Sequence, residues 1–148
     1  MPLKKVVLLL EAVKIPPHGI HLIVKIKINN RIARLVLDTG ASQTVLDRNR
    51  IQRFVKDQKF VKSHGHTSGI GSNKLESHFV SIKKIEVGKI VLNNSELVML
   101  DLIHVNASYA MIKKKPVDGV LGGDILNQLS AVINYPNREM TLKQKSKS

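Results

Sequence analysis

The sequence predicts one mainly β domain that closes into a barrel. Its 148 residues are 43% hydrophobic and 24% charged, which suits a single globular core that buries roughly 70% of the unfolded surface. Most of the chain consists of short apolar runs separated by polar turn residues. The chain contains no cysteine, so core burial and not disulfides must hold it together. We place this domain at residues 1–142 and a basic, polar tail at residues 143–148.

The N-terminus has a basic start followed by the apolar run from Val6 to Leu10. Glu11 ends this run before it reaches the length that a signal peptide or a membrane-spanning helix requires. We therefore expect a first β-strand here, in a cytoplasmic protein without a membrane partner.

A β-hairpin is expected next, after a break at residues 16–19. Apolar and polar residues alternate over residues 20–28, which is the period of a strand. Asn29 and Asn30 stand where a two-residue turn belongs, because asparagine tolerates positive φ. Residues 32–37 then form the partner strand, which runs directly into Asp38.

The remaining elements follow from weaker signals. Residues 44–55 predict a short helix at best, and the glycine-rich residues 62–72 predict a mobile hairpin arm between strands at 59–61 and 75–82. Strands are expected at 85–87, 90–92, 97–102, 117–121, 131–135 and 140–142. Asn106 is expected to cap a helix over 107–113, and Asp124 to cap a helix that ends near Leu129.

The segment Leu35–Ser42 places the Asp38 carboxylate at the end of an apolar strand, followed by a hydroxyl residue, a glycine and a small residue. A carboxylate there is costly unless its oxygens receive hydrogen bonds, and glycine lets backbone N–H groups approach closely enough to donate them. Taken alone, this pattern is more often a simple turn capped by the aspartate.

Residues 117–126 change that interpretation. With this second segment, the sequence resembles the retropepsin-like aspartic proteases, particularly their small single-domain cellular and bacterial members. Those enzymes pair an apolar strand ending in Asp-Ser/Thr-Gly with a later segment of two apolar residues, a glycine and a helix, and the resemblance covers roughly residues 20–142. It implies a closed acid-protease-type β-barrel with one or two short helices and a flap hairpin, and the activity of an aspartic endopeptidase.

The resemblance also implies roles for single residues. Asp38 matches the catalytic aspartate, Thr39 the residue whose hydroxyl bonds across the subunit interface, and Gly40 the glycine whose N–H supports the carboxylate. Ser42 matches a serine that bonds the outer carboxylate oxygen in some members, where many viral members carry an acidic residue. The other matched positions are the apolar floor and glycine of the second motif, Val120, Leu121 and Gly122, and the flap positions Gly65, Ser68, Gly69, Ile70 and Gly71. Gly123 and Asp124 depart from the Arg-Asn of viral members.

This chemistry needs two carboxylates that share one proton, and the sequence holds a single Asp-Ser/Thr-Gly. Asp118 lacks the following hydroxyl residue, and Asp124 is better explained as a helix cap. A twofold dimer would bring Asp38 to its own copy, so we expect a homodimer that acts on a peptide or protein substrate without a metal or another cofactor. The alternative is a catalytically weak dimer of the same fold that serves in binding or assembly.

Two other kinds of partner were considered. His64 and His66 could chelate a metal, but two imidazoles without a third ligand on a glycine-rich arm are better explained as solvated loop residues. The net charge of +13 attracts anionic partners. Nucleic acid is not expected among them, because the charges are spread along the chain and aromatic residues make up only 3% of it.

Overall fold

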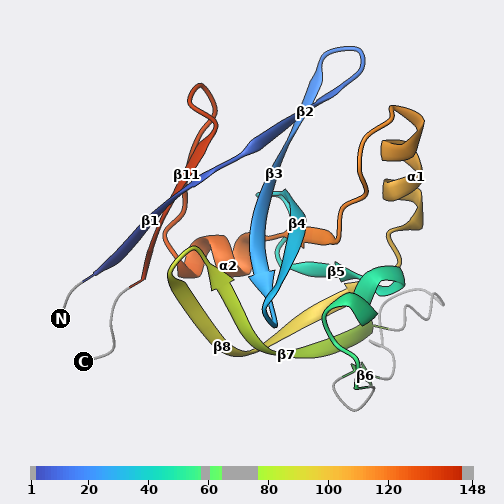
Figure 1. Ribbon diagram of the computed structural model, residues 1–148, viewed down its shortest axis with the longest axis vertical. Helices are drawn as coiled ribbons and strands as arrows, with labels where there is room; N and C mark the ends of the chain where they lie inside the picture. The colour runs from blue at the N-terminus through green and yellow to red at the C-terminus, as the bar shows by residue number, and fades with distance from the viewer. Residues whose placement is uncertain (1–2, 58–60, 65–76, 145–148) are drawn as a thin grey trace, which may run out of the picture.

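The structure, a computed structural model, describes residues 3–57, 61–64 and 77–144 (Figure 1). The strands of the first half are β1 (Lys4–Leu9), β2 (Glu11–Ile15), β3 (Gly19–Ile28), β4 (Arg31–Leu37), β5 (Val45–Asp47) and β6 (Val61–His64). Those of the second half are β7 (Ser77–Val87), β8 (Ile90–Leu100), β9 (Gly119–Leu121), β10 (Val132–Asn134) and β11 (Glu139–Gln144). The helices are the 3₁₀ helix η1 (Arg48–Arg53), α1 (Ile103–Met111) and α2 (Gly123–Gln128).

The larger sheet closes into a barrel. Its strand order is β2-β3-β4-β9-β5-β8-β7-β6, and β3 also pairs with β7 through Lys27 opposite Glu86 and Ile28 opposite Ile85. The strands β3, β4, β9, β5, β8 and β7 therefore form a closed ring, which confirms the predicted mainly β barrel. A separate sheet of order β1-β11-β10 lies beside it, at the left of Figure 1.

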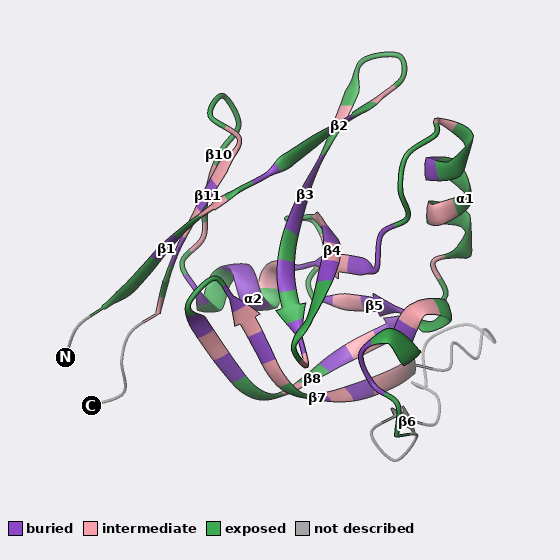
Figure 2. Ribbon diagram, viewed as in Figure 1, coloured by how far each residue is buried: buried purple, intermediate pink, exposed green. Residues whose placement is uncertain are grey.

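The barrel core follows the alternation that was predicted from the sequence. In β3, Leu22, Val24, Ile26 and Ile28 are buried and face the interior, whereas the lysines between them are exposed. Figure 2 shows the same banding of buried and exposed segments along β7 and β8. The interior is filled from all six strands, with Leu35, Leu46, Val80, Leu97 and Leu121 among its members.

The predicted hairpin at Asn29 and Asn30 is confirmed. Both residues have positive φ, 48° and 70°, and β3 pairs with β4 on either side of them. The predicted first strand is also confirmed as β1, which pairs with β11. Strand β2 was not predicted, because Glu11 and Lys14 hide its short apolar pattern, and it is held by pairing with β3.

Two pairs of predicted strands are each one long strand. Residues 77–87 run without a break as β7, and residues 90–100 run as β8 through Asn93 and Asn94, where a gap between two strands was predicted. Asn94 has a φ of 54°, and the β7–β8 pairing continues in the same register on both sides of it, at Asn93 and Ser95. Pairing on either side therefore carries the strand through the local turn preference of asparagine.

Both predicted helix caps were wrong. Helix α1 begins at Ile103, so Asn106 lies inside it, and its amide bonds the main chain of Val117 in both directions, at 2.7 and 3.1 Å. Helix α2 is preceded by Gly122, and Asp124 lies in its first turn with a carboxylate that accepts from Thr44. In each case a distant segment uses the side chain that was expected to cap the helix.

The predicted short helix at residues 44–55 is confirmed only in its second half, since strand β5 comes first and η1 follows it. Asp47, between the two, caps η1 by accepting from the Asn49 N–H at 3.0 Å. The last strand extends to Gln144, beyond the position where the tail was expected to begin.

Candidate active site

The two motifs that were predicted from the sequence lie side by side. Strand β4 is parallel to β9, with Val36 opposite Val120 and Leu37 opposite Leu121. Where β4 ends, the Asp38 N–H donates to the Leu121 carbonyl at 3.1 Å. The barrel thus holds the start of the Asp38 turn against the end of β9.

Asp38 itself is exposed, as are Thr39 and Gly40. The Gly40 N–H donates to Asp38 Oδ1 at 2.9 Å, and the Ala41 N–H donates to the Asp38 carbonyl at 3.2 Å. A Cβ on Gly40 would lie 3.3 Å from the same Oδ1. The turn therefore orients the carboxylate through a main-chain donor and leaves it at the surface of the protomer.

The start of α2 holds the chain that follows Asp38. The Gly123 N–H donates to the Ala41 carbonyl at 2.7 Å, and the Asp124 N–H donates to the Ser42 carbonyl at 3.1 Å. Ser42 is exposed and takes part here through its main chain. Because these are main-chain bonds, they fix the loop independently of the side chains at these positions.

Gly122 lies in a space that admits no side chain. A Cβ there would come within 2.6 Å of the carbonyl carbon and oxygen of Gln43, and within 2.9 Å of the Ala41 oxygen. Such distances are far below van der Waals contact, and the atoms concerned are backbone atoms that cannot move aside easily. Gly122 therefore lets the Asp38 loop lie directly on the second motif.

Thr44 joins the same two segments and was not singled out in the sequence. Its N–H and its hydroxyl donate to the Asp124 carboxylate, at 3.0 and 2.7 Å. The hydroxyl also accepts from the Gly122 N–H at 3.1 Å. Thr44 is fully buried, and since its partners come from α2, no local sequence signal marks its role.

The expected apolar floor divides between two sides of β9. Leu121 is buried inside the barrel, whereas Val120 is half-buried and faces the other side of the strand. Gly119, just before them, is so close to β5 that a Cβ would lie 2.0 Å from the Val45 carbonyl oxygen. Gly119 thus allows β9 to pack tightly against β5.

Asp118, the other aspartate considered for catalysis, is a buried structural group. It is 2% exposed and accepts from the Arg34 N–H at 2.9 Å and from Arg50 Nε at 2.7 Å. Arg53 Nη1 bonds the same carboxylate oxygen as Arg50. Two guanidinium groups and a main-chain donor thus occupy this carboxylate.

Asp47 is a second buried carboxylate that was not singled out in the sequence. It accepts from Asn49, from the Leu102 N–H at 3.1 Å and from the Asn106 side chain at 3.1 Å. These contacts tie β5 to the start of α1.

The base of the predicted flap is an antiparallel pair, with Val61 opposite Val80 and His64 opposite Ser77. The flap positions Gly65, Ser68, Gly69, Ile70 and Gly71 lie outside the described residues, so their roles stay predictions. His66 and the side chain of His64 also lie outside that part of the chain.

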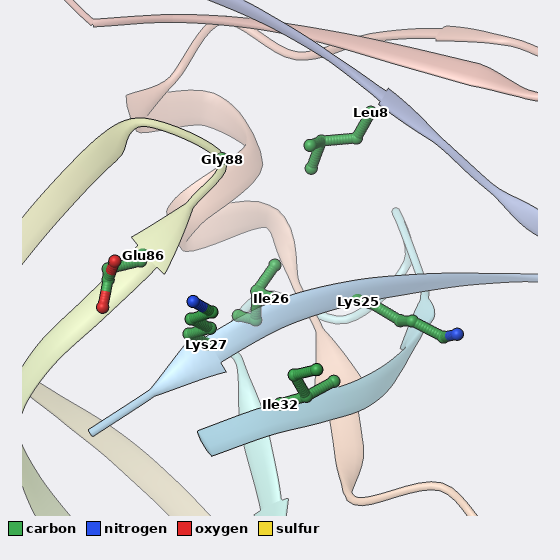
Figure 3. A pocket seen from close by; sticks show the side chains of 7 residues that line it. All are labelled: Leu8, Lys25, Ile26, Lys27, Ile32, Glu86 and Gly88. Carbon is green, nitrogen blue, oxygen red and sulfur yellow. The ribbon is translucent and has the colours of Figure 1, made fainter. Parts of the chain in front are cut away.

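A hollow of about 250 Å³ lies between β1, β3 and the β7–β8 turn (Figure 3). Leu8, Ile26 and Ile32 form its apolar side, with Lys25 and Lys27 beside them. Ile32 is near the start of β4, whereas Asp38 follows its end. This hollow is therefore separate from the candidate active site.

Residues 3–57, 61–64 and 77–144 contain no group of three or more histidines or acids placed to hold a metal ion. Over the same ranges, no helix has the length and apolar character needed to cross a membrane.

Comparisons with known proteins agree with this geometry. A family model described as aspartyl protease matches residues 24–125. A retropepsin-like aspartic protease from Rickettsia conorii has a similar structure, with a TM-score of 0.60, 16% identity, and coverage of 97% of this chain and 92% of that one. The retroviral protease-like domain of Ddi1 from Leishmania major gives a TM-score of 0.58 at 14% identity, covering 82% and 87%.

The EIAV protease, solved with an inhibitor, gives a TM-score of 0.51 at 21% identity, covering 82% of this chain and 99% of that one. A search of curated proteins found no match. At these identities the structural likeness concerns the fold.

Proposed function

Since this chain belongs to the aspartyl protease family, we propose that it is an endopeptidase whose active site forms when Asp38 meets its own copy in a homodimer. The observation that carries the proposal is the exposed Asp38 carboxylate, oriented by the Gly40 N–H and supported from below by β9. The fold and the family support a hydrolase of the aspartic protease type. Peptidase activity and dimerisation go beyond the fold and the family and are our proposal.

The dimer is proposed because the described residues of one protomer offer one suitable carboxylate. Asp118 and Asp47 are buried and already occupied by their donors, so neither can face Asp38 across a water. A twofold contact through the exposed turn at residues 38–40 would place two identical carboxylates together. In that contact we expect the Thr39 hydroxyl to brace the interface and Ser42 to lie beside the outer carboxylate oxygen.

The reaction needs one proton shared by the pair. The ionised carboxylate takes a proton from a water whose oxygen attacks the scissile carbonyl carbon, while the protonated carboxylate gives its proton to the carbonyl oxygen. In the collapse of the tetrahedral intermediate, the carboxyl group that took the water proton gives it to the peptide nitrogen, the other carboxylate takes a proton from one hydroxyl of the intermediate, and the C–N bond breaks as the C=O bond forms. The pair is then singly protonated again. Since both fully ionised and fully protonated pairs are inactive, activity should rise and then fall with pH.

The flap positions are proposed to close over the substrate, as the family resemblance implies. Gly69 and Gly71 would allow that movement, so replacing both with alanine should lower turnover. The cytoplasmic location expected from the N-terminal sequence also stays a prediction.

Digestion of a diverse peptide library by the wild type and by Asp38→Asn, with products identified by mass spectrometry, tests the proposal. Sedimentation of both proteins gives the oligomeric state in the same buffer. We expect cleavage by the wild type only, and a dimer in both cases, because the amide is nearly the same shape as the carboxylate.

Equal cleavage by the two proteins would remove Asp38 from the mechanism. A dimer that binds peptides without releasing new N-termini would instead identify a binding protein of this fold. A strictly monomeric protein that cleaves would disprove the shared site.

A further inference from the structure

A hollow of about 320 Å³ lies between the β3–β4 turn, the end of η1 and β7. Asn29 and Arg31 line one side of it, residues 53–57 line the second, and Ser81 and Lys83 line the third. Arg31 begins β4, whereas Asp38 follows its end, roughly 20 Å further along the strand. The Arg31 side of the hollow is therefore far from the candidate active site.

The Asn29 side chain ties the three sides of the hollow together. Its Nδ2 donates to the Phe54 carbonyl at 3.1 Å, and its Oδ1 accepts from the Lys84 N–H at 3.2 Å. The Asn29 N–H donates to the Lys84 carbonyl at 2.9 Å, and the β3–β4 turn accordingly lies against β7 (Figure 1). Because all these partners are main-chain atoms, the shape of the hollow is fixed before a ligand binds.

The lining of the hollow is strongly basic. It holds four cationic side chains and one acidic one, that of Asp57, which gives a formal charge of +3; the cations are Arg31, Arg53, Lys56 and Lys83. Within the part of the chain that the structure describes, the side chains of Arg31 and Lys56 have neither a hydrogen bond nor an ion pair. Both residues are exposed, so their charge is available to an anion from solvent.

Arg53 is held in a fixed orientation beside the hollow. Its Nη1 bonds the Asp118 carboxylate, and its guanidinium carbon lies 5.2 Å from the centroid of the Phe54 ring. Its side chain is still 45% exposed. Arg50 Nε donates to the same Asp118 oxygen at 2.7 Å, so a single carboxylate faces two guanidinium groups and cannot neutralise both. A guanidinium that is already oriented loses little conformational entropy when it binds an anion.

Charge and size together indicate the class of ligand. A terminal phosphate group carries about 1.5 to 2 negative charges and three acceptor oxygens, whereas a carboxylate carries one charge and two oxygens. The volume of the hollow lies at the lower end of the range for small-molecule sites. A short chain of linked phosphates therefore matches the hollow better than an acidic peptide, which brings less charge in the same space.

The floor of the hollow offers little to a nucleobase. Phe54 is the aromatic residue of the lining, and it is only 6% exposed. Val55 beside it is 4% exposed. Stacking of a base needs an open aromatic face, so recognition should depend on the phosphates and not on a base.

We propose that this hollow binds a short polyphosphate chain through Arg31, Arg53, Lys56 and Lys83, whether the chain is inorganic or is the triphosphate of a nucleotide. The site goes beyond the proposed peptidase activity and does not rest on it.

Calorimetric titration of the protein with tripolyphosphate, at low and at physiological salt, gives the first test. We expect saturable binding of one tripolyphosphate per chain, with an affinity that falls as salt screens the charges. Arg31→Gln/Lys56→Gln should weaken binding by about tenfold or more. These two positions are chosen because neither side chain has a partner among the described residues, whereas replacing Arg53 would also break its bond to Asp118.

The matched control removes the same charge from another part of the surface. Lys5 and Lys143 are exposed and lie opposite each other in the β1–β11 ladder, outside the lining of the hollow. Lys5→Gln/Lys143→Gln should therefore keep the wild-type affinity within about twofold. Equal weakening in the two double variants would show that diffuse positive charge binds the anion, and would overturn the hollow as its site. The absence of saturable binding at low salt would overturn it as well.

A second titration compares ligands on the wild type. ATP should bind about as tightly as tripolyphosphate, adenosine should not bind, and hexaglutamate should bind about tenfold more weakly or worse. Binding of adenosine would contradict recognition through phosphate. Hexaglutamate that binds as tightly as tripolyphosphate would overturn the preference for phosphate and would identify an acidic peptide as the partner.

Nuclear magnetic resonance separates this site from the proposed active site. When tripolyphosphate is added, the amide signals of Arg31, Val55 and Ser81 should shift, while those of Thr39 and Gly40 stay in place. The same shifts are expected in Asp38→Asn, so the site is supported even if the wild type cleaves no peptide. Shifts centred on residues 38–40 would overturn the hollow as the polyphosphate site, whether or not the wild type is a protease.

Discussion

Two aspartates at opposite ends of the β4–β9 pair differ in almost every respect. Asp118 precedes β9, is 2% exposed and accepts from two guanidinium groups and the Arg34 N–H. Asp38 follows β4, is exposed and, among the hydrogen bonds of the described residues, accepts one side-chain bond, from the Gly40 N–H. Asp118 thus stabilises the fold at one end of the strand pair, whereas Asp38 is exposed to solvent at the other end.

The contrast shows which carboxylate is available for chemistry. A buried carboxylate must be satisfied by donors, and a substrate cannot easily displace donors that belong to the fold. An exposed carboxylate with one main-chain donor keeps lone pairs for water and for a second carboxyl group. Five substitutions, ordered by expected effect, test this distinction.

Asp38→Asn should have the largest effect on activity and almost none on stability. The loss of a general acid–base group should lower kcat/KM about a thousandfold or more, while the urea midpoint stays at the wild-type value because the carboxylate is exposed. Peptide cleavage and urea unfolding are measured on the same preparation. A large loss of stability would place Asp38 with Asp118 among the structural acids.

Gly122→Ala should disrupt the packing of the Asp38 loop on the second motif. The added methyl group would meet the Gln43 carbonyl at 2.6 Å, so we expect a loss of about 3 kcal/mol in the free energy of unfolding and a matching loss of activity. Gly123→Ala is the control, because its Cβ would lie 3.4 Å from the Ala41 oxygen. Equal tolerance of both variants would show that the loop is not held as tightly as the geometry indicates.

Asp118→Asn should show the opposite pattern to Asp38→Asn, with its main effect on stability and not on activity. Replacing the charge removes charge-assisted bonds from Arg50 and Arg53, so the free energy of unfolding should fall by about 2 kcal/mol. Asp101→Asn is the control, because this exposed acid accepts from Arg48, from the Asn49 side chain and from the Ile103 N–H, and an amide oxygen can still accept the last two bonds; it should change the urea midpoint far less. If Asp118→Asn were as stable as the wild type, the buried pairs would contribute nothing to the fold.

Thr44→Val tests the link between the two motifs. The substitution leaves the buried Gly122 N–H without its acceptor and removes a donor to Asp124, which should cost about 1.5 kcal/mol in the free energy of unfolding. Thr141→Val, at a half-buried position of β11, is the matched control and should leave the free energy of unfolding unchanged. A similar urea midpoint for the two variants would argue against the hydroxyl link.

Glu11→Gln should have the smallest effect, and one that depends on pH. The hydrogen bond from Arg34 lowers the pKa of Glu11 in the folded protein below its ordinary value of 4.5. Its stabilisation is therefore complete above pH 4.5 and is lost as the pH falls through the lowered value. With Glu11 48% exposed, the wild type should exceed the variant by only a few tenths of a kcal/mol at pH 7. Thermal unfolding from pH 3 to 7 measures the difference, which should not grow in acid.

Local pattern was a good guide wherever the deciding contacts were also local. The alternation in residues 20–28 and the tolerance of asparagine for positive φ predicted β3, the turn and β4 correctly. Local preference failed at Asn94, where the ladder with β7 carries the strand through a residue with positive φ. It failed again at Asn106, whose amide is bound by Val117 instead of capping α1.

The sequence by itself determined the β-rich barrel and the two motifs that meet in it, because side-chain period and short motifs are properties of adjacent residues. Only the tertiary structure decided which carboxylates are hydrogen-bonded by donors from other elements and which one is exposed to solvent. Asp118 receives its donors from β4 and η1, and Asp124 accepts from Thr44, which directly precedes β5. Those donors lie many residues away along the chain, so the local sequence around either aspartate does not show that its carboxylate is already hydrogen-bonded.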